Sequence, residues 1–390
     1  MTEGPPLRIL FATPAYWPAT AFGGPTRAAK ELTEGLVRAG HHVDVLTTSL
    51  QTVDGRPASR LHSERATVSG VEVLYLATPA RYRWMGITPT IPLAWPWRDR
   101  PDIVHVFGYR DVVTTLTAGW ARAMRVPYVF EPLDMFLPRF RNVPLKRAFD
   151  RVLGEPVAHG ADIVVACSQH EKAQLVEAGL AESRVQTRPN GFPAPAEGGN
   201  DELRSRLGLR PDDKLVLSVG RISFKKGLDL LLDAVAALED VHLAIVGPDD
   251  GDGTLAMLEQ RRAELGVEDR VHFVGTLDTT RPCDVYGGAD VFVLASRNES
   301  FGIVAAEAVA CAVPTVVTDQ CGVAEILGDA ALVVPCDTEA IRAAIAQILT
   351  TPELRARLAA AGPEVARAYS WDAMVTRQVD LYRQVLDQRG

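Results

Sequence analysis

A short basic turn bounded by glycines is the first candidate for chemistry. Residues 220–227 read GRISFKKG and stand between an apolar run and an amphipathic one. Glycines such as Gly220 let a ligand approach the backbone closely, while Arg221 and Lys226 supply fixed positive charge. Close approach and charge together suit a diphosphate, and a basic surface turn without a ligand is the alternative interpretation.

Two carboxylates eight residues apart are the second candidate. Glu299 falls in a predicted loop, and Glu307 falls about a turn and a half into the predicted helix that follows. Carboxylate oxygens accept hydrogen bonds, so Glu299 fits the hydroxyls of a sugar and Glu307 those of a ribose. The amides of Gly302 and Ile303 begin the helix and can bind phosphate. An ordinary helix start with a solvated Glu307 is the alternative.

Both motifs fall where an α/β sheet places a ligand site. Short apolar runs alternate with amphipathic stretches, which is typical of parallel strands covered by helices. Ligands bind such sheets beyond the carboxyl ends of the strands, where both motifs begin. We therefore predict two Rossmann-like, doubly wound α/β domains that face each other across a cleft. The predicted strands are Leu7–Ala12, Val43–Leu46, Val71–Leu76, Ile103–Phe107, Tyr128–Phe130, Ile163–Ala166, Leu215–Val219, Leu243–Val246, Val271–Val274, Val291–Leu294, Thr315–Val317 and Leu332–Val334.

A change in composition marks the boundary between the two domains. Three prolines and an Asn-Gly pair between residues 189 and 195, followed by Glu197-Gly198-Gly199, predict a linker over residues 191–200. It separates a domain of residues 1–190 from one of residues 201–370. Two amphipathic helices are expected to close the chain, the last at about Asp372–Leu386 within residues 371–390. The helices predicted before them are Pro25–Ala39, Leu228–Leu238, Leu255–Leu265 and Ile303–Ala310.

The turn and the glutamate pair together resemble the retaining glycosyltransferase family 4, the group 1 glycosyl transferases of GT-B fold. The family pattern is a Gly-Arg-x(4)-Lys-Gly turn followed by Glu-x(7)-Glu with Ser-Phe-Gly inside it, which this chain carries at 220–227 and 299–307. Gly23-Gly24 is similar to the family's donor-phosphate loop and Asn190-Gly191 to the start of its linker, so the resemblance spans nearly the whole chain. It implies a hexosyltransferase-type enzyme (EC 2.4) whose final helix crosses back onto the first domain. It also implies that the N-terminal domain binds the acceptor and the C-terminal domain the nucleotide-sugar donor.

The same resemblance implies roles for single residues. Gly24, Arg221 and Lys226 would contact the donor diphosphate, Glu299 the hydroxyls of the transferred sugar, and Glu307 the ribose. The catalytic candidates are therefore Arg221, Lys226 and Glu299. The base would lie against the segment after Gly275, and residues 301–303 would give backbone contacts. The donor-binding candidates are Gly23, Gly24, Gly220, Gly275, Phe301, Gly302, Ile303 and Glu307.

The acceptor side departs from the family pattern. Many members carry a catalytic-site histidine after the strand that corresponds to Tyr128–Phe130, whereas this chain has Leu133 there. Glu131 and Asp134 are the acceptor-side candidates in its place, with capping or turning of the chain as the alternative. His105 ends a strand in an Asp-x-x-His pattern similar to the family's and is the third candidate, with a structural histidine as the alternative.

We expect a mechanism that needs no metal and no cofactor. Breaking the anomeric carbon–oxygen bond places negative charge on the diphosphate, which Arg221, Lys226 and the helix start at Gly302 can stabilise. No carboxylate nucleophile is evident, so front-face attack with retention is favoured, in which a donor phosphate oxygen takes the acceptor's proton. Asp250-Gly251-Asp252 resembles a metal motif of another glycosyltransferase fold, and we interpret it as a solvated turn.

Other functions share part of this pattern. A GT-B sugar-nucleotide epimerase and a nucleotide-sugar-binding pseudoenzyme would use the same donor contacts, so both stay as alternatives. An NAD-dependent dehydrogenase needs GxGxxG after a strand, and the turn after the first predicted strand lacks it.

The formal net charge of −8 is unevenly distributed. Residues 1–190 carry 22 Lys+Arg and 18 Asp+Glu, whereas residues 191–390 carry 19 and 31. A chain this acidic is a poor nucleic-acid binder, so no nucleic acid is expected as a partner. The basic first half can face an anionic acceptor or membrane, because basic and aromatic residues mix in segments 81–85, 95–98 and 136–153. A solvated basic face is the alternative.

The rest of the composition narrows the setting but not the substrate. The start of the chain lacks the order of a secretory signal, so we expect a cytoplasmic protein, peripheral at the inner face of the membrane if it meets lipid. The five cysteines are scattered without a CxxC pair, so no disulfide framework is expected, and we interpret Cys167 and Cys311 as buried apolar side chains. The sequence identifies neither the donor base (UDP- or GDP-type) nor the oligomeric state. For the acceptor it leaves a lipid-linked or polysaccharide precursor and a small-molecule natural product.

Overall fold

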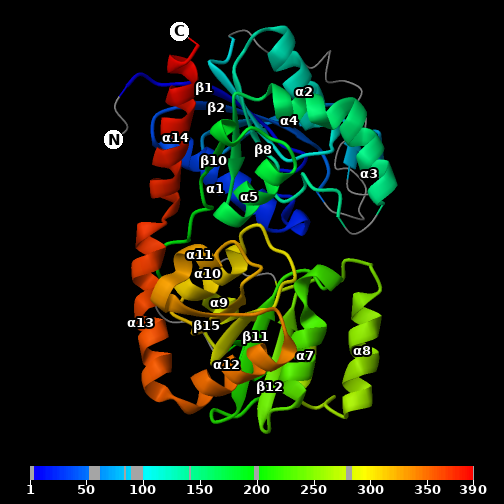
Figure 1. Cartoon of the computed structure of the whole chain (residues 1–390), viewed down its shortest axis with the longest axis vertical. Coiled ribbons are helices and arrows are strands. Elements are labelled where there is room, and N and C mark those ends of the chain that lie inside the picture. Colours follow the sequence, from blue (N-terminus) through cyan, green and yellow to red (C-terminus); the bar gives the residue numbers. More distant parts are fainter. Residues whose placement is uncertain are drawn as a thin grey trace. The chain divides into compact units, whose positions relative to one another are not determined.

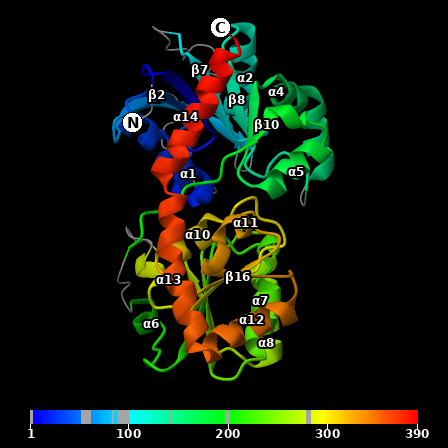
Figure 2. The same cartoon turned by 60° about the vertical axis from the view of Figure 1, so that its left-hand side comes forward.

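The chain folds into two compact units, one made of Met1–Asn190 with Trp371–Gly390 and the other of Gly191–Ser370. This computed structural model describes residues 4–51, 62–82, 85–88, 100–139, 142–196, 202–277 and 283–389. Each unit has a mainly parallel sheet between helices, which confirms the predicted α/β class (Figures 1 and 2). Among these described residues, no helix is long and apolar enough to cross a membrane.

The first unit is built on an eight-stranded sheet in the order β10-β9-β8-β7-β1-β2-β4-β3. Its strands pair in parallel, except that β3 runs antiparallel to β4 at the edge. The interior strand β7 is buried along its whole length because helices cover the sheet. Helix α14, from the end of the chain, packs against α1 (Figure 2). The elements are β1 (Arg8–Ala12), α1 (Gly24–Arg38), β2 (His42–Thr48), β3 (Glu64–Val68), β4 (Val71–Leu76), β5 (Ala80–Tyr82), β6 (Met85–Ile87), β7 (Ile103–Phe107), α2 (Val112–Ala123), β8 (Tyr128–Glu131), α3 (Val143–Phe149), α4 (Glu155–Gly160), β9 (Ile163–Ala166), α5 (Gln169–Glu177), β10 (Val185–Thr187) and α14 (Trp371–Asp387).

The second unit has a six-stranded, fully parallel sheet in the order β13-β12-β11-β14-β15-β16. Counted from β11, this is the strand order of a dinucleotide-binding sheet. The chain adds strands in one direction from β11 to β13 and in the opposite direction from β14 to β16, so the strand order reverses between β11 and β14. Ligands bind such sheets at that reversal. Helices α7, α8 and α12 lie on one face of the sheet, and α9, α10 and α13 lie on the other (Figure 1). The elements are α6 (Glu202–Arg206), β11 (Lys214–Val219), α7 (Leu228–Ala236), β12 (Val241–Val246), α8 (Thr254–Leu265), β13 (Val271–Gly275), α9 (Cys283–Tyr286), β14 (Val291–Leu294), α10 (Ile303–Ala310), β15 (Thr315–Thr318), α11 (Ala324–Leu327), β16 (Ala331–Val334), α12 (Thr338–Thr350) and α13 (Pro352–Ala368).

Every predicted strand overlaps a strand of the structure, and the strands that the sequence missed are short or exposed. Strand β3 lacks an apolar run because none of its residues is fully buried. Strands β5, β6 and β10 have three residues each. The expectation of two closing helices is wrong, because Thr351 ends α12 and Pro352 starts a separate α13 before α14.

The chain passes between the units at Asn190–Gly191 and again at Ser370–Trp371. Beside these passages, the amide of Phe192 donates to the carbonyl oxygen of Tyr369 at 2.8 Å. The two rings also lie against each other, with centroids 6.1 Å apart. Within the predicted linker, Glu197-Gly198-Gly199 lies outside the described residues.

Candidate active site

The basic turn 220–227 leaves β11 and enters α7, at the reversal point of the second sheet. Gly227 adopts a left-handed φ of 61°, and a Cβ added there would lie 2.0 Å from the carbonyl oxygen of Ala295. Only glycine therefore lets the turn approach the end of β14 this closely. Gly220, Arg221 and Lys226 are among the residues that line a small hollow at this point.

The turn brings Lys226 onto Glu299, the first carboxylate of the second motif. Lys226 Nζ lies 2.5 Å from Glu299 Oε2, and both side chains keep 15% of their surface exposed. Burial by itself would raise the pKa of Glu299, but the charges of Lys226, Lys225 and Arg221 outweigh it and hold the pKa at about 2. The carboxylate is therefore ionised at neutral pH and suited to accept hydrogen bonds from hydroxyls.

Backbone pairing fixes the loop that carries Glu299. Its amide donates to the carbonyl oxygen of Gln320 at 3.0 Å, and its carbonyl oxygen accepts from the amide of Gly322 at 2.9 Å. Gly302 caps α10 with a φ of 108°, where an added Cβ would lie 2.8 Å from a methyl carbon at the end of β14. The helix start at Gly302 and Ile303 is thus held at the carboxyl edge of the sheet.

An arginine that sequence reasoning missed locks the two motifs together. Arg297 Nη1 and Nη2 lie 2.7 and 2.6 Å from the two carboxylate oxygens of Asp229 on α7. Burial raises the pKa of Asp229, but these hydrogen bonds and the charge of Arg297 outweigh it and leave the pKa lowered. Arg297 also donates to the carbonyl oxygen of Phe224 at 2.9 Å and stacks over its ring at 4.3 Å. The basic turn is therefore tied directly to the loop of Glu299.

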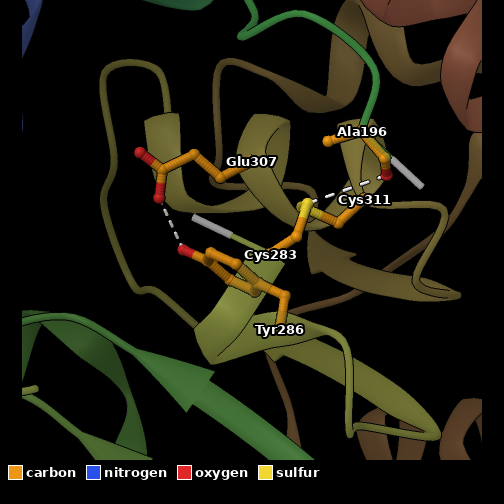
Figure 3. Close-up of a disulfide and its surroundings, with 5 residues drawn as sticks. All are labelled: Ala196, Cys283, Tyr286, Glu307 and Cys311. Atoms are coloured by element: carbon orange, nitrogen blue, oxygen red, sulfur yellow. Dashed lines mark hydrogen bonds between the residues drawn. A yellow bond between two sulfur atoms is a disulfide. The ribbon is translucent and has the colours of Figure 1, made fainter. Parts of the chain in front are cut away.

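The second carboxylate, Glu307, is buried and has a tyrosine partner. Only 3% of Glu307 is exposed, and the hydroxyl of Tyr286 on α9 donates to its Oε2 at 2.6 Å (Figure 3). The interpretation of Glu307 as a solvated helix residue is therefore wrong. Tyr286 precedes the strand run by five residues, and nothing in that spacing points to Glu307.

A disulfide lies next to this pair, so two expectations are wrong: that there is no disulfide, and that Cys311 is a buried apolar side chain. Cys283 on α9 is bonded to Cys311 at the end of α10, with Cα atoms 5.5 Å apart (Figure 3). The two residues are 28 positions apart in the sequence, so no local spacing reveals the pair. Cys167 is buried, as predicted, and its Sγ donates to Glu171 Oε2 at 2.9 Å.

The remaining donor-side candidates of the second unit lie around the same sheet edge. Gly275 ends β13, and its carbonyl oxygen accepts from the amide of Gly247 at 2.9 Å. Phe301 buries its ring edge-on to Phe192, with centroids 6.2 Å apart, and its carbonyl oxygen accepts from the amide of Val323 at 2.8 Å.

The acidic loop after β12 is largely exposed, as its sequence suggests, and its aspartates also contact the basic turn. Arg221 Nη1 donates to Asp250 at 2.7 Å, and Asp252 accepts from the amides of Phe224 and Thr254. Within the described part of the chain, no cluster of three or more His, Cys, Asp or Glu could hold a metal ion.

Gly23 and Gly24 belong to the first unit, where they start α1. Gly23 is the N-cap with a φ of 77°, and a Cβ added there would meet no atom within 4 Å. The open amides at this helix start suit an anion. The other donor-side candidates all belong to the second unit.

His105 and Glu131, two acceptor-side candidates, are turned into the core of the first unit. Their side chains are 0% and 1% exposed. Glu131 Oε2 lies 2.5 Å from Arg188 and 3.3 Å from His105, whose Nδ1 lies 2.6 Å from the hydroxyl of Tyr382. In this structure neither side chain is open to an acceptor, and the structural alternative stated for both residues describes them better.

Titration directions agree with a structural role for this cluster. Burial raises the pKa of Glu131, but the charge of Arg188 and the contact with His105 outweigh it and leave it lowered. Burial also lowers the pKa of His105 more strongly than Glu131 raises it. Glu131 is therefore the anion that neutralises the buried Arg188.

Asp134 stays near the surface on the same loop. It has a left-handed φ of 60°, and its amide donates to Glu171 at 2.8 Å. Arg110, which sequence reasoning missed, supports this loop by donating to the carbonyl oxygens of Met135 and Phe136 while pairing with Asp150 at 2.6 Å. Asp134 is the acceptor-side candidate that remains accessible.

Two family models match adjoining parts of the chain. The model of the glycosyl transferase 4-like domain matches residues 23–191, and that of the glycosyl transferases group 1 matches residues 199–365. The boundary between the matches falls in the predicted linker.

Relatives and solved structures agree with these matches. The D-inositol 3-phosphate glycosyltransferase of Xylanimonas cellulosilytica is 31% identical over 100% of this chain and 99% of its own. That of Thermomonospora curvata is 36% identical over 73% of each chain. Sucrose-phosphate synthase from Thermosynechococcus elongatus shares the fold with a TM-score of 0.78 at 24% identity, covering 97% of this chain and 99% of its own. Anabaena HepE, solved with UDP and glucose, shares it with a TM-score of 0.76 at 20% identity, covering 97% and 99%. The chain therefore belongs to the group 1 glycosyltransferases, the family 4 enzymes of GT-B fold.

Proposed function

We propose that this glycosyltransferase moves a sugar from a nucleotide-diphosphate donor to an acceptor with retention and without a metal. The observation that carries the proposal is the contact between Lys226 and Glu299 at the reversal point of the second sheet. Opposite charges lie there side by side, one suited to a phosphate and the other to sugar hydroxyls. A bound donor would separate the pair, so that Lys226 contacts the phosphate and Glu299 the sugar hydroxyls.

The donor is proposed to be a UDP- or GDP-sugar. Two structures of Anabaena HepE, which shares the fold, contain UDP with glucose and UDP-glucose. The second unit offers that chemistry a basic turn for the diphosphate and a buried carboxylate, Glu307, for the ribose. UDP-sugars are therefore the first donors to assay.

The leaving diphosphate would be stabilised by charges of the chain itself. Lys225, Lys226 and Arg221 rise from one turn, and the charge of each lowers the pKa of Glu299, which supports a shared action on the diphosphate. The helix start at Gly302 adds the positive end of a dipole. Each such group is worth on the order of 10²–10³ in rate, by analogy with oxyanion donors. The acceptor would attack the same face that the diphosphate leaves, with its proton passing to a donor phosphate oxygen.

The test is turnover of UDP-sugars in a strong chelator, with the anomeric configuration of the product read by NMR. We expect undiminished activity and a product whose configuration matches the donor's. Loss of activity that manganese restores would refute the metal-free mechanism, and an inverted product would refute front-face attack. Conversion of the donor without acceptor would instead identify an epimerase.

The first acceptor to assay is a phosphorylated cyclitol. The two relatives described above are named D-inositol 3-phosphate glycosyltransferases, and the first half of this chain has the cationic excess that an anionic acceptor needs. Lipid-linked sugars and small natural products form the comparison panel. Transfer to inositol 3-phosphate that exceeds transfer to unphosphorylated inositol would support this choice, and equal transfer would refute it.

We also propose peripheral contact with anionic membrane through α3 and the turn after it. No residue of α3 is buried, and Leu145, Val152 and Leu153 expose 53%, 70% and 45% of their surface beside Lys146, Arg147 and Arg151. Apolar side chains among cations are what an interfacial helix presents to lipid. Arg83, Trp84, residues 95–98, Phe140 and Arg141, which suggested the same contact, lie outside the described residues.

Sedimentation with vesicles that contain anionic lipid tests this contact. Binding should fade as salt rises and should be lost in Val152→Asp with Leu153→Asp. Met257→Asp is the matched control, because Met257 is 39% exposed on α8, which belongs to the other unit. Absence of binding at low salt, or equal loss in the control, would refute the contact.

A further inference from the structure

The carboxylate of Glu307 is held by a short helix that has little stability of its own. Tyr286, which donates to Glu307 Oε2 at 2.6 Å, lies on α9, a helix of four residues. So short a helix is unstable alone and depends on its attachments. Tyr286 is 1% exposed, with its ring edge-on to Phe292 at 5.6 Å. The position of its hydroxyl is therefore set by whatever holds α9 in place.

The disulfide is the covalent attachment of α9 to the helix that carries Glu307. Cys283 and Tyr286 are three residues apart on α9, and Glu307 and Cys311 are four apart at the end of α10. Residues at these spacings share one face of a helix, so the disulfide and the hydrogen bond connect the same two faces (Figure 3). Once the disulfide is opened, the hydrogen bond between Tyr286 and Glu307 is the one of these two links that still joins α9 to α10.

The surroundings of the two sulfurs suit both oxidation states. Cys311 is partly exposed, whereas Cys283 is 2% exposed, so Cys311 is the more accessible of the two residues for a thiolate. Cys283 Sγ lies 3.8 Å from the carbonyl oxygen of Ala196, a contact that becomes a hydrogen bond once the sulfur carries a proton (Figure 3). The reduced thiol thus has an acceptor waiting in the folded unit.

We propose that Cys283–Cys311 is a thiol-sensitive clamp on the nucleotide site, in which Tyr286 is the positioning residue that transmits the state of the disulfide to Glu307. The inference rests on the proposed role of Glu307 as a ribose contact. A dithiol reductant supplies two electrons and two protons: its thiolate attacks Cys311 Sγ, the bond between the two cysteine sulfurs breaks, and its second thiol releases the mixed disulfide. The products are two protein thiols and the oxidised, cyclic reductant.

The experiment measures the affinity of the oxidised and the dithiothreitol-reduced protein for UDP and for GDP by calorimetry. Reduction should lower the affinity for whichever nucleotide binds by about three- to tenfold, which is the usual net contribution of one hydrogen bond. Tyr286→Phe keeps the ring but removes the hydroxyl, so it should bind as weakly as the reduced protein and should no longer respond to reduction. The double variant Cys283→Ser, Cys311→Ser should also lose the response, whereas Cys167→Ser, in the first unit, should keep it.

Hydrogen exchange across residues 303–312 supplies a readout that needs no nucleotide. Reduction should speed exchange there in the wild type, and exchange at β7 of the first unit should stay unchanged. Unaltered nucleotide affinity and unaltered exchange after complete reduction would overturn the clamp. Faster exchange with unaltered affinity, or an undiminished response in Tyr286→Phe, would overturn the role of Tyr286. If neither nucleotide binds the oxidised protein, the proposed donor site itself fails, and the clamp on nucleotide affinity fails with it.

Discussion

The two sheets use the carboxyl ends of their strands in opposite ways. Beyond β11 and β14, Lys226 and Glu299 meet in a pair that keeps 15% of each side chain exposed. At the end of β8 and just after β10, Glu131 meets Arg188 in a pair with 1% of each side chain exposed. The first pair can exchange its partners for a ligand at modest cost, whereas the second would leave a charge stranded in the core.

This difference shows that a charged residue after a strand is a weak predictor of a ligand site by itself. Glu131 has the strand-end position that suggested acceptor chemistry, yet its carboxylate neutralises an arginine 57 residues away. Glu299 has glycines, the basic turn 220–227 and a helix start around it, and its pair with Lys226 stays partly exposed. The surrounding backbone, more than the carboxylate, separates the two cases.

The largest expected effect concerns the stability of the first unit. Glu131→Ala leaves the buried guanidinium of Arg188 without its anion, so the free energy of unfolding should fall by about 3–5 kcal/mol. Asp134→Asn, on the same loop and near the surface, is the control and should cost less than about 0.5 kcal/mol. Denaturant unfolding followed by circular dichroism measures both. Equal stability of the two variants would erase the contrast between the strand ends.

The next effect is on turnover, and it should leave the second unit folded. Lys226→Ala and Glu299→Ala should each lower kcat by on the order of 10²–10³, because both groups are proposed to act on the reacting part of the donor. Glu307→Ala should instead weaken the binding of bare UDP, since its proposed partner is the ribose. Steady-state kinetics and calorimetry separate the two effects. Identical binding and turnover in Glu299→Ala and Glu307→Ala would contradict the assigned roles.

Sequence reasoning recovered the features that are local in the chain. The basic turn, the helix start at Gly302 and the alternation of strands can all be predicted because each depends on neighbouring residues. The contacts that define the site join distant residues: Lys226 to Glu299, Arg297 to Asp229 and Tyr286 to Glu307 are 73, 68 and 21 positions apart. Their pairing depends on packing that one sequence does not reveal.

A third effect is a dependence of stability on pH that arises from the pair of Lys226 and Glu299. The pKa of Glu299 is held at about 2 in the folded protein, below its ordinary value of 4.5. A lowered pKa in the folded state adds stability above about pH 4.5, and this contribution is lost as the pH falls toward 2. In a fully buried pair each unit of this pKa shift would add ~1.4 kcal/mol to the free energy of unfolding. Because both side chains are partly exposed, we expect the whole shift to contribute only about 1–2 kcal/mol. Urea unfolding of the wild type and Glu299→Gln from pH 6 to pH 3 should give a stability difference that shrinks with acid, and a constant difference would contradict the pairing.

The smallest effect tests whether the pair of Lys226 and Glu299 depends on the contact between Arg297 and Asp229. Arg297→Lys keeps the charge but loses the two-pronged contact with Asp229 and most of the stacking on Phe224. The Arg297 and Asp229 side chains are about a quarter exposed, so their contact is worth about 0.5–1 kcal/mol, and the Kd for UDP should rise two- to fivefold.

Arg261→Lys is the matched control for this substitution. Arg261 pairs with Asp233 at 2.8 Å, and Asp233 lies one helical turn beyond Asp229 on the same α7. Among the described residues, Arg261 forms hydrogen bonds with Asp233 and Glu264 and with no residue of the basic turn, so the Kd for UDP should stay unchanged. If both lysine variants weakened UDP equally, the effect would arise from α7 as a whole. If neither did, the turn and the loop of Glu299 would hold their positions through the backbone alone, and the glycines at 220, 227 and 302 would then account for the difference between the two strand ends.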